Sequence, residues 1–309
     1  MLQNFIILII ALILLVKGAT MATKYAVKIA ESFHLSKYIV GFIVIAMISI
    51  LPETLIAINS AIEGIPSLGL GTLFGGNVAD LTLVFAIIIF VTKKNIKIES
   101  KIINNHIIYP IIMLIPIIFG LDGYYSSIEG ASLIIIGLIF YFLVFKNNTE
   151  PKLENVPKHN RLKYTLLLLL SMAILLLGSH FAVTTTIKLA SNIGITPIII
   201  GMLIMGLGAT IPELLFSIKS VEKNDDSLAV GDILGTVLAD ATIVVGILAI
   251  ISPFSFPIRI VYVTGVFMVI ASFLLFYFMK SGKTLTKKES LILFIFWITF
   301  ILVELSING

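Results

Sequence analysis

Apolar residues fill most of the chain in long runs, and only short polar stretches separate one run from the next. A helix needs about 20 predominantly apolar residues to cross the hydrocarbon core of a bilayer, and the runs are close to this length. The pattern therefore predicts an all-α integral membrane protein that crosses the lipid bilayer ten times. The expected spans are residues 3–22, 38–62, 70–92, 104–120, 127–145, 164–184, 195–218, 228–252, 258–279 and 289–306.

The composition excludes several other classes of protein. Of the 309 residues, 59% are hydrophobic and 12% are charged, and the charged fraction is about half that of a soluble domain. Cysteine is absent, so disulfides and thiolate metal sites are excluded. The first apolar run lacks the basic start and the cleavage site of a signal peptide, so we expect it to be retained as the first helix. The net charge of +4 lies on lysines in short loops and does not indicate nucleic-acid binding.

The basic residues indicate how the chain is oriented. When the loops are assigned alternately to two faces, all but two of the 21 Lys and Arg residues fall on one face, and the exceptions are Lys188 and Arg259. Cytoplasmic loops carry the excess of basic residues, so we expect the richer face to be cytoplasmic and both termini to be extracellular. The Lys- and Ile-rich usage indicates an AT-rich prokaryotic genome, which would make this membrane the cell membrane.

The two halves of the chain repeat each other at an offset of 160 residues. Segment 41–83 aligns with segment 201–243 without a gap. Identical pairs at this offset include Gly18/Gly178, Gly41/Gly201, Pro52/Pro212, Glu53/Glu213, Ser60/Ser220, Gly71/Gly231, Gly75/Gly235, Asp80/Asp240 and Thr82/Thr242. Apolar matches arise easily by chance in membrane proteins, whereas paired Pro-Glu motifs and paired aspartates do not.

Each half contains five predicted spans, and an odd number forces the second copy to enter the membrane from the opposite side. We therefore expect two inverted five-helix repeats, residues 1–145 and 164–309, joined by a cytoplasmic linker at 146–163. Inverted repeats are common among secondary transporters, which place their ion sites near the bilayer midplane where the repeats meet. The candidate site is expected among the second and third helices of each half.

Four carboxylates lie near the middle of these helices: Glu53, Asp80, Glu213 and Asp240. An ionised side chain at the bilayer centre costs about 3 kcal/mol on insertion scales, so such residues are functional candidates. No Lys or Arg lies at comparable depth in the predicted spans, which leaves metal ions or protons to neutralise the acids. Ca²⁺ takes about 6–8 oxygen ligands of this kind. A single buried glutamate can instead be protonated and bonded to a neighbouring helix, but two symmetric pairs of acids favour an ion site.

Further oxygen ligands are expected beside the paired Pro-Glu motifs. Proline cannot donate a backbone hydrogen bond and clashes with the carbonyl four residues earlier, so both prolines are expected to break their helices. The freed carbonyls would lie around Ala46 and around Gly206 and would line a cavity. Hydroxyl groups are available at Ser49, Thr210 and Thr236. Ser49 and Thr236 can equally bond their own backbone carbonyls.

The segments that contain these residues have a recognisable pattern. They read GFIVIAMISILPETLIAINS with GNVADLTLVFA in the first half, and GMLIMGLGATIPELLFSIKS with GDILGTVLADATIVVGI in the second. They resemble the two α-repeats of the cation/calcium exchanger superfamily, and most closely those of its prokaryotic sodium/calcium exchanger group. The resemblance covers essentially the whole chain. It implies exchange of Ca²⁺ for Na⁺, with the helices at 3–22 and 164–184 sliding across a static core.

The resemblance also implies roles for individual residues. Glu53 and Glu213 would bind Ca²⁺ and also serve the Na⁺ sites. The other ligands that it implies are the carbonyls of Ala46 and Gly206 and the hydroxyls of Ser49, Thr210 and Thr236.

The chain departs from the pattern of the superfamily in four places. The usual Gly-Thr-Ser-x-Pro-Glu motif loses one hydroxyl at Ile50 in the first half and another at Ala209 in the second. The pattern of the superfamily has Ser or Thr directly after the position of Gly75, whereas this chain has Gly76 there. Many sodium-coupled relatives carry Asn at one of the two positions that are aspartates here. The site is therefore expected to contain fewer hydroxyls and more carboxylates than that of a standard Na⁺ exchanger.

These departures leave the counter-ion open. A Ca²⁺/Na⁺ antiporter is the first hypothesis, and Ca²⁺/H⁺ exchange or a K⁺-dependent exchange is the alternative that additional carboxylates would suit. A membrane-embedded enzyme is a third class, but the chain contains neither a His-Glu-x-x-His motif nor a nucleophile paired with a base. We expect no cofactor and no obligatory protein partner, only the transported cations and the lipid bilayer.

Overall fold

The structure of the chain is a computed structural model that describes residues 2–31, 45–98, 108–146, 161–194 and 196–308. Within these ranges, eight helices are long and apolar enough to cross a membrane. Two shorter apolar helices, Ala46–Ile62 and Ile108–Asp122, are also present in the described ranges. Each of these helices overlaps one of the ten predicted spans, and the predicted all-α membrane fold is confirmed.

The elements of the two halves follow similar, though not identical, orders. The first half consists of α1 (Leu2–Glu31), α3 (Ala46–Ser49), α4 (Leu51–Ile62), α5 (Pro66–Ala79), a π-helical turn (Asp80–Val84), α6 (Phe85–Thr92), β1 (Ile96–Lys97), α8 (Ile108–Phe119), a 3-10 turn (Gly120–Asp122), β2 (Tyr124–Tyr125) and α9 (Ser127–Lys146). The second half consists of α10 (Arg161–Ile193), α11 (Pro197–Ile200), a π-helical turn (Gly201–Met205), α12 (Gly206–Glu222), α13 (Asp226–Ala239), a π-helical turn (Asp240–Val244), α14 (Val245–Ile251), β3 (Phe254–Ser255), a π-helical turn (Val261–Gly265), α15 (Val266–Gly282), β4 (Thr284–Leu285) and α16 (Lys287–Asn308).

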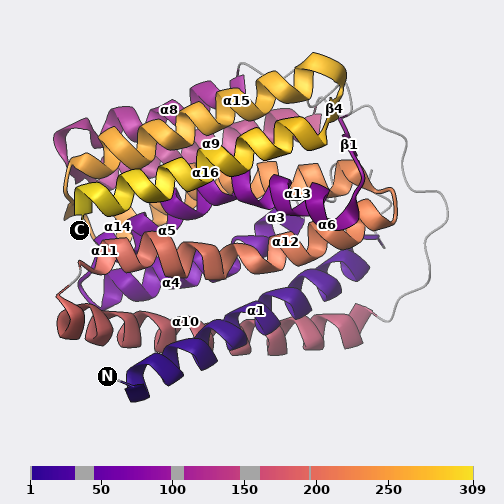
Figure 1. The fold of residues 1–309 in the computed structure, drawn as a ribbon. Helices are drawn as coiled ribbons and strands as arrows, with labels where there is room; N and C mark the ends of the chain where they lie inside the picture. The colour runs from indigo at the N-terminus through magenta and orange to yellow at the C-terminus, as the bar shows by residue number, and fades with distance from the viewer. Residues whose placement is uncertain (1, 32–44, 99–107, 147–160, 195, 309) are drawn as a thin grey trace.

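Two short antiparallel ribbons join the halves, β1 with β4 and β2 with β3. Each ribbon pairs the loop after the third span of one half with the loop between the last two spans of the other half. Exchanging the halves converts one ribbon into the other, as an inverted repeat requires. In Figure 1, β1 and β4 lie at one end of the helices and both chain termini lie at the other end.

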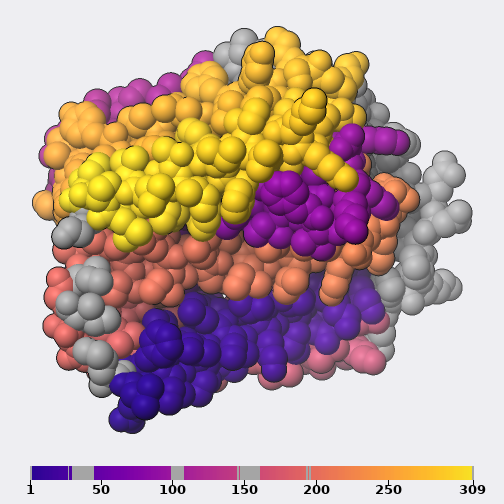
Figure 2. All heavy atoms as spheres, viewed as in Figure 1, coloured from indigo at the N-terminus to yellow at the C-terminus, as the bar shows by residue number. Residues whose placement is uncertain are grey.

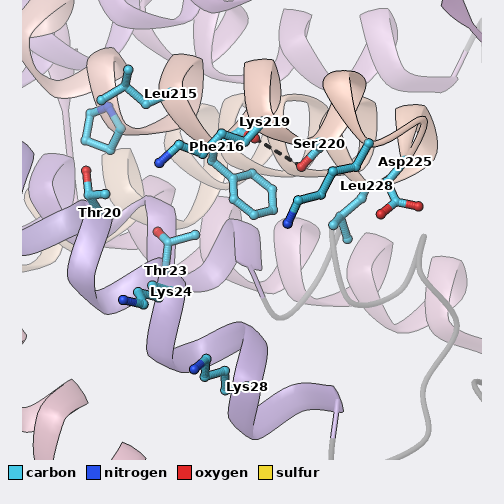
Figure 3. Close-up of a pocket in the computed structure, with 12 residues that line it drawn as sticks. Thr20, Thr23, Lys24, Lys28, Leu215, Phe216, Lys219, Ser220, Asp225 and Leu228 are labelled. Carbon is cyan, nitrogen blue, oxygen red and sulfur yellow. Dashed lines mark hydrogen bonds between the residues drawn. The ribbon is translucent and has the colours of Figure 1, made fainter. Parts of the chain in front are cut away.

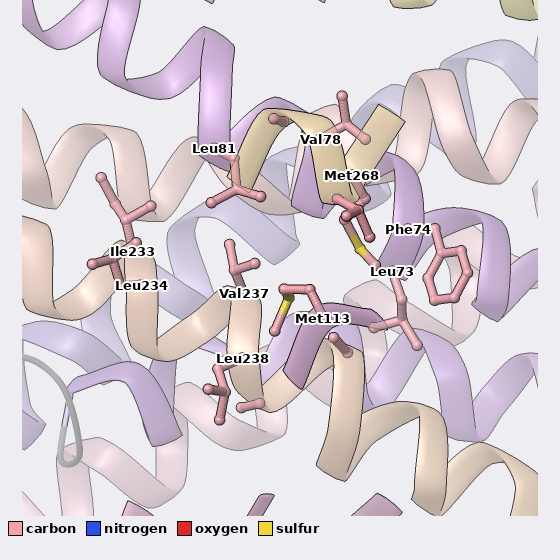
Figure 4. Packing of buried hydrophobic residues seen from close by; sticks show 14 of the residues in the cluster. Leu73, Phe74, Val78, Leu81, Met113, Ile233, Leu234, Val237, Leu238 and Met268 are labelled. Carbon is pink, nitrogen blue, oxygen red and sulfur yellow. The ribbon is translucent and has the colours of Figure 1, made fainter. Parts of the chain in front are cut away.

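The third and eighth spans form the centre of the molecule. The most apolar windows of Pro66–Thr92 and Asp226–Ile251 are 78% and 89% buried, more than those of the other long spans of the described chain. Their side chains pack against each other and against Met113 of α8 and Met268 of α15 (Figure 4). Because a Cβ atom on Gly71 would lie 2.5 Å from the Ile198 carbonyl oxygen, only glycine allows α5 to pack so closely against α11.

Helices α1 and α10 lie side by side along one edge of the molecule (Figures 1 and 2). They share a hydrophobic cluster with parts of α4, α5 and α12 that is separate from the main core. The contact between them is symmetric: Gly18 of α1 faces Leu175, and Gly178 of α10 faces Leu15. Both residues of each contact have their counterpart 160 positions away. The outer pair of helices therefore meets the rest of the protein across an interface of its own.

The two prolines do not break their helices as expected. In the first half, the helix is interrupted at Ile50, and Pro52 lies in the first turn of α4, where its missing N–H group has no intrahelical acceptor to lose. In the second half, α12 continues through Pro212, and the irregular backbone is the π-helical turn that precedes Gly206. The expectation of a break at Pro212 was wrong because a helix can remain continuous when only one hydrogen bond is lost.

The predicted division of the chain stays a prediction. Most of the proposed linker at 146–163 lies outside the described residues, although α9 ends at Lys146 and α10 begins at Arg161. Both α1 and α10 are longer than their predicted spans, because their polar ends remain helical beyond the apolar window.

Candidate cation site

The four predicted acids occupy equivalent places in the two halves. Glu53 lies in the first turn of α4, and Glu213 lies in α12 directly after Pro212. Asp80 and Asp240 each open a π-helical turn of five residues, at positions 160 residues apart. Such turns widen a helix locally and occur often at functional sites. Contacts link the helices α4, α5, α12 and α13 and the two turns, and the four acids are close enough to interact electrostatically, so they share a common interior.

The four carboxylates are buried and repel one another. None of their side chains is more than 3% exposed. Glu53 is subject to Coulombic repulsion from Asp240 and Asp80, and Glu213 to repulsion from Glu53 and Asp80. Within the described part of the chain, no Lys, Arg or His side chain is among the buried ones. Neutralising charge must therefore come from a mobile cation or a proton.

Several oxygens in this interior lack hydrogen-bond partners among the described residues. They are Glu53 Oε2, Asp80 Oδ1, both carboxylate oxygens of Glu213, Asp240 Oδ1 and Thr236 Oγ1. We refer to these atoms as the unpartnered oxygens. A buried polar group without a partner costs about 1–3 kcal/mol, and more when it is charged. Coordination of a hard cation by oxygen would remove this cost, so the residues present fit a cation site.

The other predicted ligands differ in their surroundings. Ser49 Oγ donates a hydrogen bond of 2.9 Å to Asp232 Oδ1, so the alternative that it bonds its own helix is wrong. Thr210 Oγ1 does bond its own helix, at the Leu207 carbonyl. The Ala46 carbonyl accepts the Ile50 N–H group at 3.0 Å and retains a second lone pair. The Gly206 backbone packs directly on α5. The expectation that the Gly206 carbonyl binds a cation remains a prediction.

Sequence reasoning missed a fifth acid in this region. Asp232 of α13 is fully buried, and its Oδ2 atom has no hydrogen-bond partner in the described chain. Coulombic repulsion links it to Glu53, Asp80 and Glu213. A carboxylate inside the apolar run 228–252 was the available signal, but Asp232 has Thr72 as its counterpart and so escapes a search for paired acids.

A second missed acid has a different environment. Glu304 of α16 is buried and accepts a hydrogen bond from the Thr264 hydroxyl.

The carboxylates do not form one tight ring. Among the described residues, no group of three or more Asp, Glu, His or Cys side chains is placed to hold a single metal ion. An ion in this interior would therefore be bound by one or two carboxylates, and hydroxyl and carbonyl oxygens would have to complete its coordination.

A cavity of about 460 Å³ opens between α1 and α12 near the lysine-rich end of the molecule. Figure 3 shows Thr20 and Thr23 of α1 on one wall and Leu215 and Phe216 of α12 on the other. Pro212, the neighbour of Glu213, also lines it. The remaining lining residues are Lys24, Lys28, Lys219, Ser220, Lys223, Asp225 and Leu228. The cavity thus extends from the lysine-rich end toward the candidate site.

Comparisons with known proteins bear on this arrangement. The profile of the family described as "Sodium/calcium exchanger protein" matches residues 3–146 and 163–305. The uncharacterised membrane protein MJ0091 of Methanocaldococcus jannaschii is 27% identical over 278 residues, with 89% of each chain covered. The sodium/calcium exchanger MaX1 of Methanosarcina acetivorans is 22% identical, covering 97% of this chain and 98% of that one.

A solved structure of the sodium–calcium exchanger NCX_Mj superposes on this chain with a TM-score of 0.73, at 21% identity, over 97% of this chain and 98% of the other. The likeness shows that the two chains share a fold, including its two inverted five-helix repeats.

Proposed function

Because the chain belongs to the sodium/calcium exchanger protein family, we propose that it is a secondary antiporter that exchanges Ca²⁺ for Na⁺ across a membrane. The observation that carries this proposal is the set of unpartnered oxygens on Glu53, Asp80, Glu213 and Asp240, buried where no basic side chain of the described chain is buried with them. Only a mobile cation or a proton can neutralise such a set.

The proposed ligands combine charged and neutral oxygens. We take Glu53 and Glu213 as the central pair, as the resemblance to the exchanger superfamily implies, and Asp80 and Asp240 as further charged ligands on elements that contact theirs. The neutral ligands are the hydroxyls of Ser49, Thr210 and Thr236 and the carbonyls of Ala46 and Gly206. This mixture suits Ca²⁺, which requires more oxygens than two carboxylates supply.

Coupling between the ions follows from electrostatics. Ca²⁺ and Na⁺ compete for overlapping carboxylates, so one ion leaves before the other binds. A site without cations would have to carry bare carboxylates past apolar barriers, and this cost prevents the protein from switching sides when the site is not neutralised. The separate hydrophobic interface of α1 and α10 supports these two helices as the part that moves.

The proposed topology places the protein in the cell membrane with both termini outside. The gathering of lysines at one end of the molecule supports this topology. Lys94 Nζ donates hydrogen bonds to the Glu222 carbonyl and to Asn224 at the end of α12. Lys219 and Lys223, at the same end of α12, line the cavity. A protease added to intact cells should remove tags from both termini. Protection of either tag would contradict the topology.

Proton coupling is the second candidate. The observation that favours it is the number of carboxylates, since aspartates stand at both 80 and 240 and Asp232 adds a further one. Each can carry a proton in place of Na⁺. A K⁺-dependent exchange would use the negative charge of these same additional carboxylates to bind K⁺.

One experiment separates these functions. Purified protein in proteoliposomes would be given external ⁴⁵Ca²⁺ with an outward gradient of Na⁺, of K⁺ or of protons, each imposed alone. We expect Na⁺ to drive uptake. Uptake driven only by the proton gradient would establish the second candidate, and absence of uptake under every gradient would overturn the antiporter proposal. The double variant Glu53→Gln/Glu213→Gln, which lacks the central pair, serves as the inactive control.

A further inference from the structure

Four lysines line the cavity between α1 and α12, which leads toward a site proposed for cations. Lys24 and Lys28 belong to α1, and Lys219 and Lys223 lie at the end of α12. Of the described residues that line this cavity, only Asp225 is acidic. Figure 3 shows Lys24 and Lys28 on one wall and Lys219 on the other. A space with this excess of positive charge repels a cation and favours an anion.

Contacts with neutral groups leave the charge of these lysines intact. Lys28 Nζ donates a hydrogen bond of 3.2 Å to the Tyr164 hydroxyl and lies 4.7 Å from the centre of the Tyr164 ring. Lys24 Nζ lies 5.7 Å from the centre of the Tyr25 ring. Within the described part of the chain, no ion pair joins any of the four lysines to a carboxylate. Their positive charge is therefore available to a bound anion.

The inverted repeat does not duplicate this set of lysines. The residues 160 positions from Lys24, Lys28, Lys219 and Lys223 are Thr184, Lys188, Asn59 and Glu63. On that side, the Asn59 amide donates a hydrogen bond of 2.8 Å to Ser179, which joins α4 directly to α10. The general excess of lysines on one face serves to orient the chain, but orientation does not require four of them to converge on one space between two helices.

The cavity is apolar at depth and charged at its rim. Leu215 and Phe216 line it inside the predicted span 195–218, and Leu215 is 39% exposed. The four lysines lie just beyond the ends of the spans 3–22 and 195–218, at the level where lysines place their charge among lipid head groups. The volume of about 460 Å³ lies in the range of small-molecule sites. This polarity matches a molecule with an anionic head and an apolar tail.

From this arrangement we propose that the cavity binds an anionic phospholipid, whose phosphate lies among the four lysines and whose acyl chain lies against Leu215 and Phe216. Basic pockets between membrane helices bind lipid head groups of this kind. A phospholipid suits the cavity better than a free phosphate ion, because an ion would leave the apolar wall uncovered.

The bound lipid also has a consequence for transport, which rests on the proposed antiport. Its phosphate neutralises lysines at the entrance of a cavity that leads toward Glu213. The entrance then no longer repels a cation. We therefore expect an anionic lipid to accelerate Ca²⁺ exchange.

Lipid binding can be measured without transport. Purified protein in detergent would be titrated with phosphatidylglycerol or with phosphatidylcholine of the same acyl chains, and retained lipid would be counted by native mass spectrometry. We expect one phosphatidylglycerol per chain at concentrations at which phosphatidylcholine is not retained. The variant Lys219→Gln/Lys223→Gln should bind phosphatidylglycerol at least about tenfold more weakly. Lys24→Gln, on the opposite wall, should weaken binding in the same direction and is a second test if the double variant does not fold.

A matched control removes the same charge at the same end of the molecule. Lys287 and Lys288 are exposed in the first turn of α16, directly after β4, and do not line the cavity. Lys287→Gln/Lys288→Gln should retain phosphatidylglycerol as the unmodified protein does. Inorganic phosphate distinguishes the two sources of the anion: it should not displace the lipid at equal concentration, and displacement would overturn the assignment to a lipid.

Exchange in proteoliposomes tests the consequence for transport. Replacing part of the phosphatidylcholine with phosphatidylglycerol should accelerate Na⁺-driven ⁴⁵Ca²⁺ uptake by the unmodified protein more than uptake by Lys219→Gln/Lys223→Gln. An anionic membrane surface attracts Ca²⁺ for both proteins, so the difference between them isolates the cavity. In phosphatidylcholine alone, the variant should exchange at least as fast as the unmodified protein, because the repulsion is already relieved.

The possible results separate the lipid site from the proposed antiport. Equal retention of the two lipids by the unmodified protein, or equal retention of phosphatidylglycerol by the unmodified protein and by folded Lys219→Gln/Lys223→Gln, would overturn the site whatever the exchange activity. Selective retention that the variant loses would establish the site, even if no ion gradient drove Ca²⁺ uptake and the antiport failed. Equal acceleration of both proteins by phosphatidylglycerol would overturn the role of the lipid at the entrance.

Discussion

Glu213 illustrates why the acids of the interior have a functional explanation. Its side chain is fully buried, and neither carboxylate oxygen has a hydrogen-bond partner in the described chain. It is also repelled by Glu53 and Asp80. A residue selected for stability would be neutral at this position, because unpaired buried charge destabilises a protein. The destabilising charge of Glu213 is therefore explained by a site whose negative charge is neutralised only when cations are bound.

The first prediction follows from this conflict between stability and function. Glu213→Gln should lower Ca²⁺ affinity by about 100-fold, since removing one partner of a buried charge pair costs about 3 kcal/mol. The same change should raise the melting temperature in Ca²⁺-free buffer, because it relieves repulsion. Binding of ⁴⁵Ca²⁺ and thermal unfolding in detergent measure the two effects.

Glu222→Gln is the control for Glu213→Gln, because Glu222 lies exposed at the end of the same helix. It should change neither quantity. Unimpaired Ca²⁺ binding by Glu213→Gln would remove this residue from the site.

The second prediction concerns a neutral ligand. Thr236 Oγ1 is one of the unpartnered oxygens, whereas Thr242, six residues later, donates to the Leu238 carbonyl. Thr236→Ala should lower the affinity for a transported cation about fivefold, as expected for a contact of about 1 kcal/mol. Thr242→Ala should have no such effect. Equal affinities of the two variants, measured by cation binding, would show that the Thr236 hydroxyl is not a ligand.

Residues in symmetric pairs could be predicted from the sequence, and residues without a counterpart could not. The four acids were found because each pair recurs at one offset, and the structure buries all four. Asp232 has Thr72 as its counterpart, so the same criterion passed over it. Its bond to Ser49 joins residues 183 positions apart. Such a contact depends on how α3 packs against α13, which local sequence does not encode.

At the scale of helices, the crossing of α1 and α10 depends on two glycines. A Cβ atom on Gly18 would lie 3.0 Å from Leu175 Cγ and 3.1 Å from its backbone nitrogen. A Cβ atom on Gly178 would lie 3.0 Å from the Leu15 backbone nitrogen. A methyl group at either position would require the neighbouring leucine to shift, and a larger side chain would separate the two helices. Since both helices are proposed to move together, their separation should affect transport as well as stability.

The third prediction tests this crossing. Gly18→Leu should destabilise the protein by about 1–3 kcal/mol, as overpacking of a well-packed contact does, and should slow exchange in proteoliposomes. Ile10→Phe enlarges a side chain of the same helix that is exposed at its outer surface, so it should leave both quantities unchanged. Normal stability and normal exchange in Gly18→Leu would show that the close crossing is not required.

The number and the approximate places of the spans followed from hydropathy alone, but their internal geometry did not. Hydropathy detects the apolar window, so it missed the polar helical ends of α1 and α10. It also gave no indication of the π-helical turns that begin at Asp80 and Asp240. These turns depend on tertiary packing in the centre of the molecule. The break expected at Pro212 was wrong because α12 stays continuous despite the one hydrogen bond that proline removes.

At the scale of the whole molecule, the inverted repeat makes opposite faces comparable. Leu215 lines the cavity at the lysine-rich end, and its counterpart Leu55 lies on α4 in the other half. If the protein exposes its site alternately to the two faces, a thiol at each position should be accessible from one face only. The chain has no cysteine, so it is already a suitable background for such an experiment.

The fourth prediction uses this pair of positions. Leu215→Cys should react with a membrane-impermeant thiol reagent applied at the lysine-rich face, and Leu55→Cys with the reagent applied at the opposite face. Conditions that increase the reaction of one should decrease the reaction of the other, and the rates of labelling in oriented vesicles measure both. Simultaneous increases at both positions would contradict alternating access.

The two ribbons and the contact of α5 with α11 have a consequence for how the protein is made. Each joins segments from different halves, so the first five helices cannot complete their packing during their own synthesis. At about 5–20 residues per second, the ribosome needs roughly 10–30 s to produce the second half. Until α11 and α12 have been synthesised, α5 lacks the neighbours that these two helices provide. A nascent chain that stops near residue 146 should therefore be degraded by membrane proteases instead of accumulating as a stable fragment.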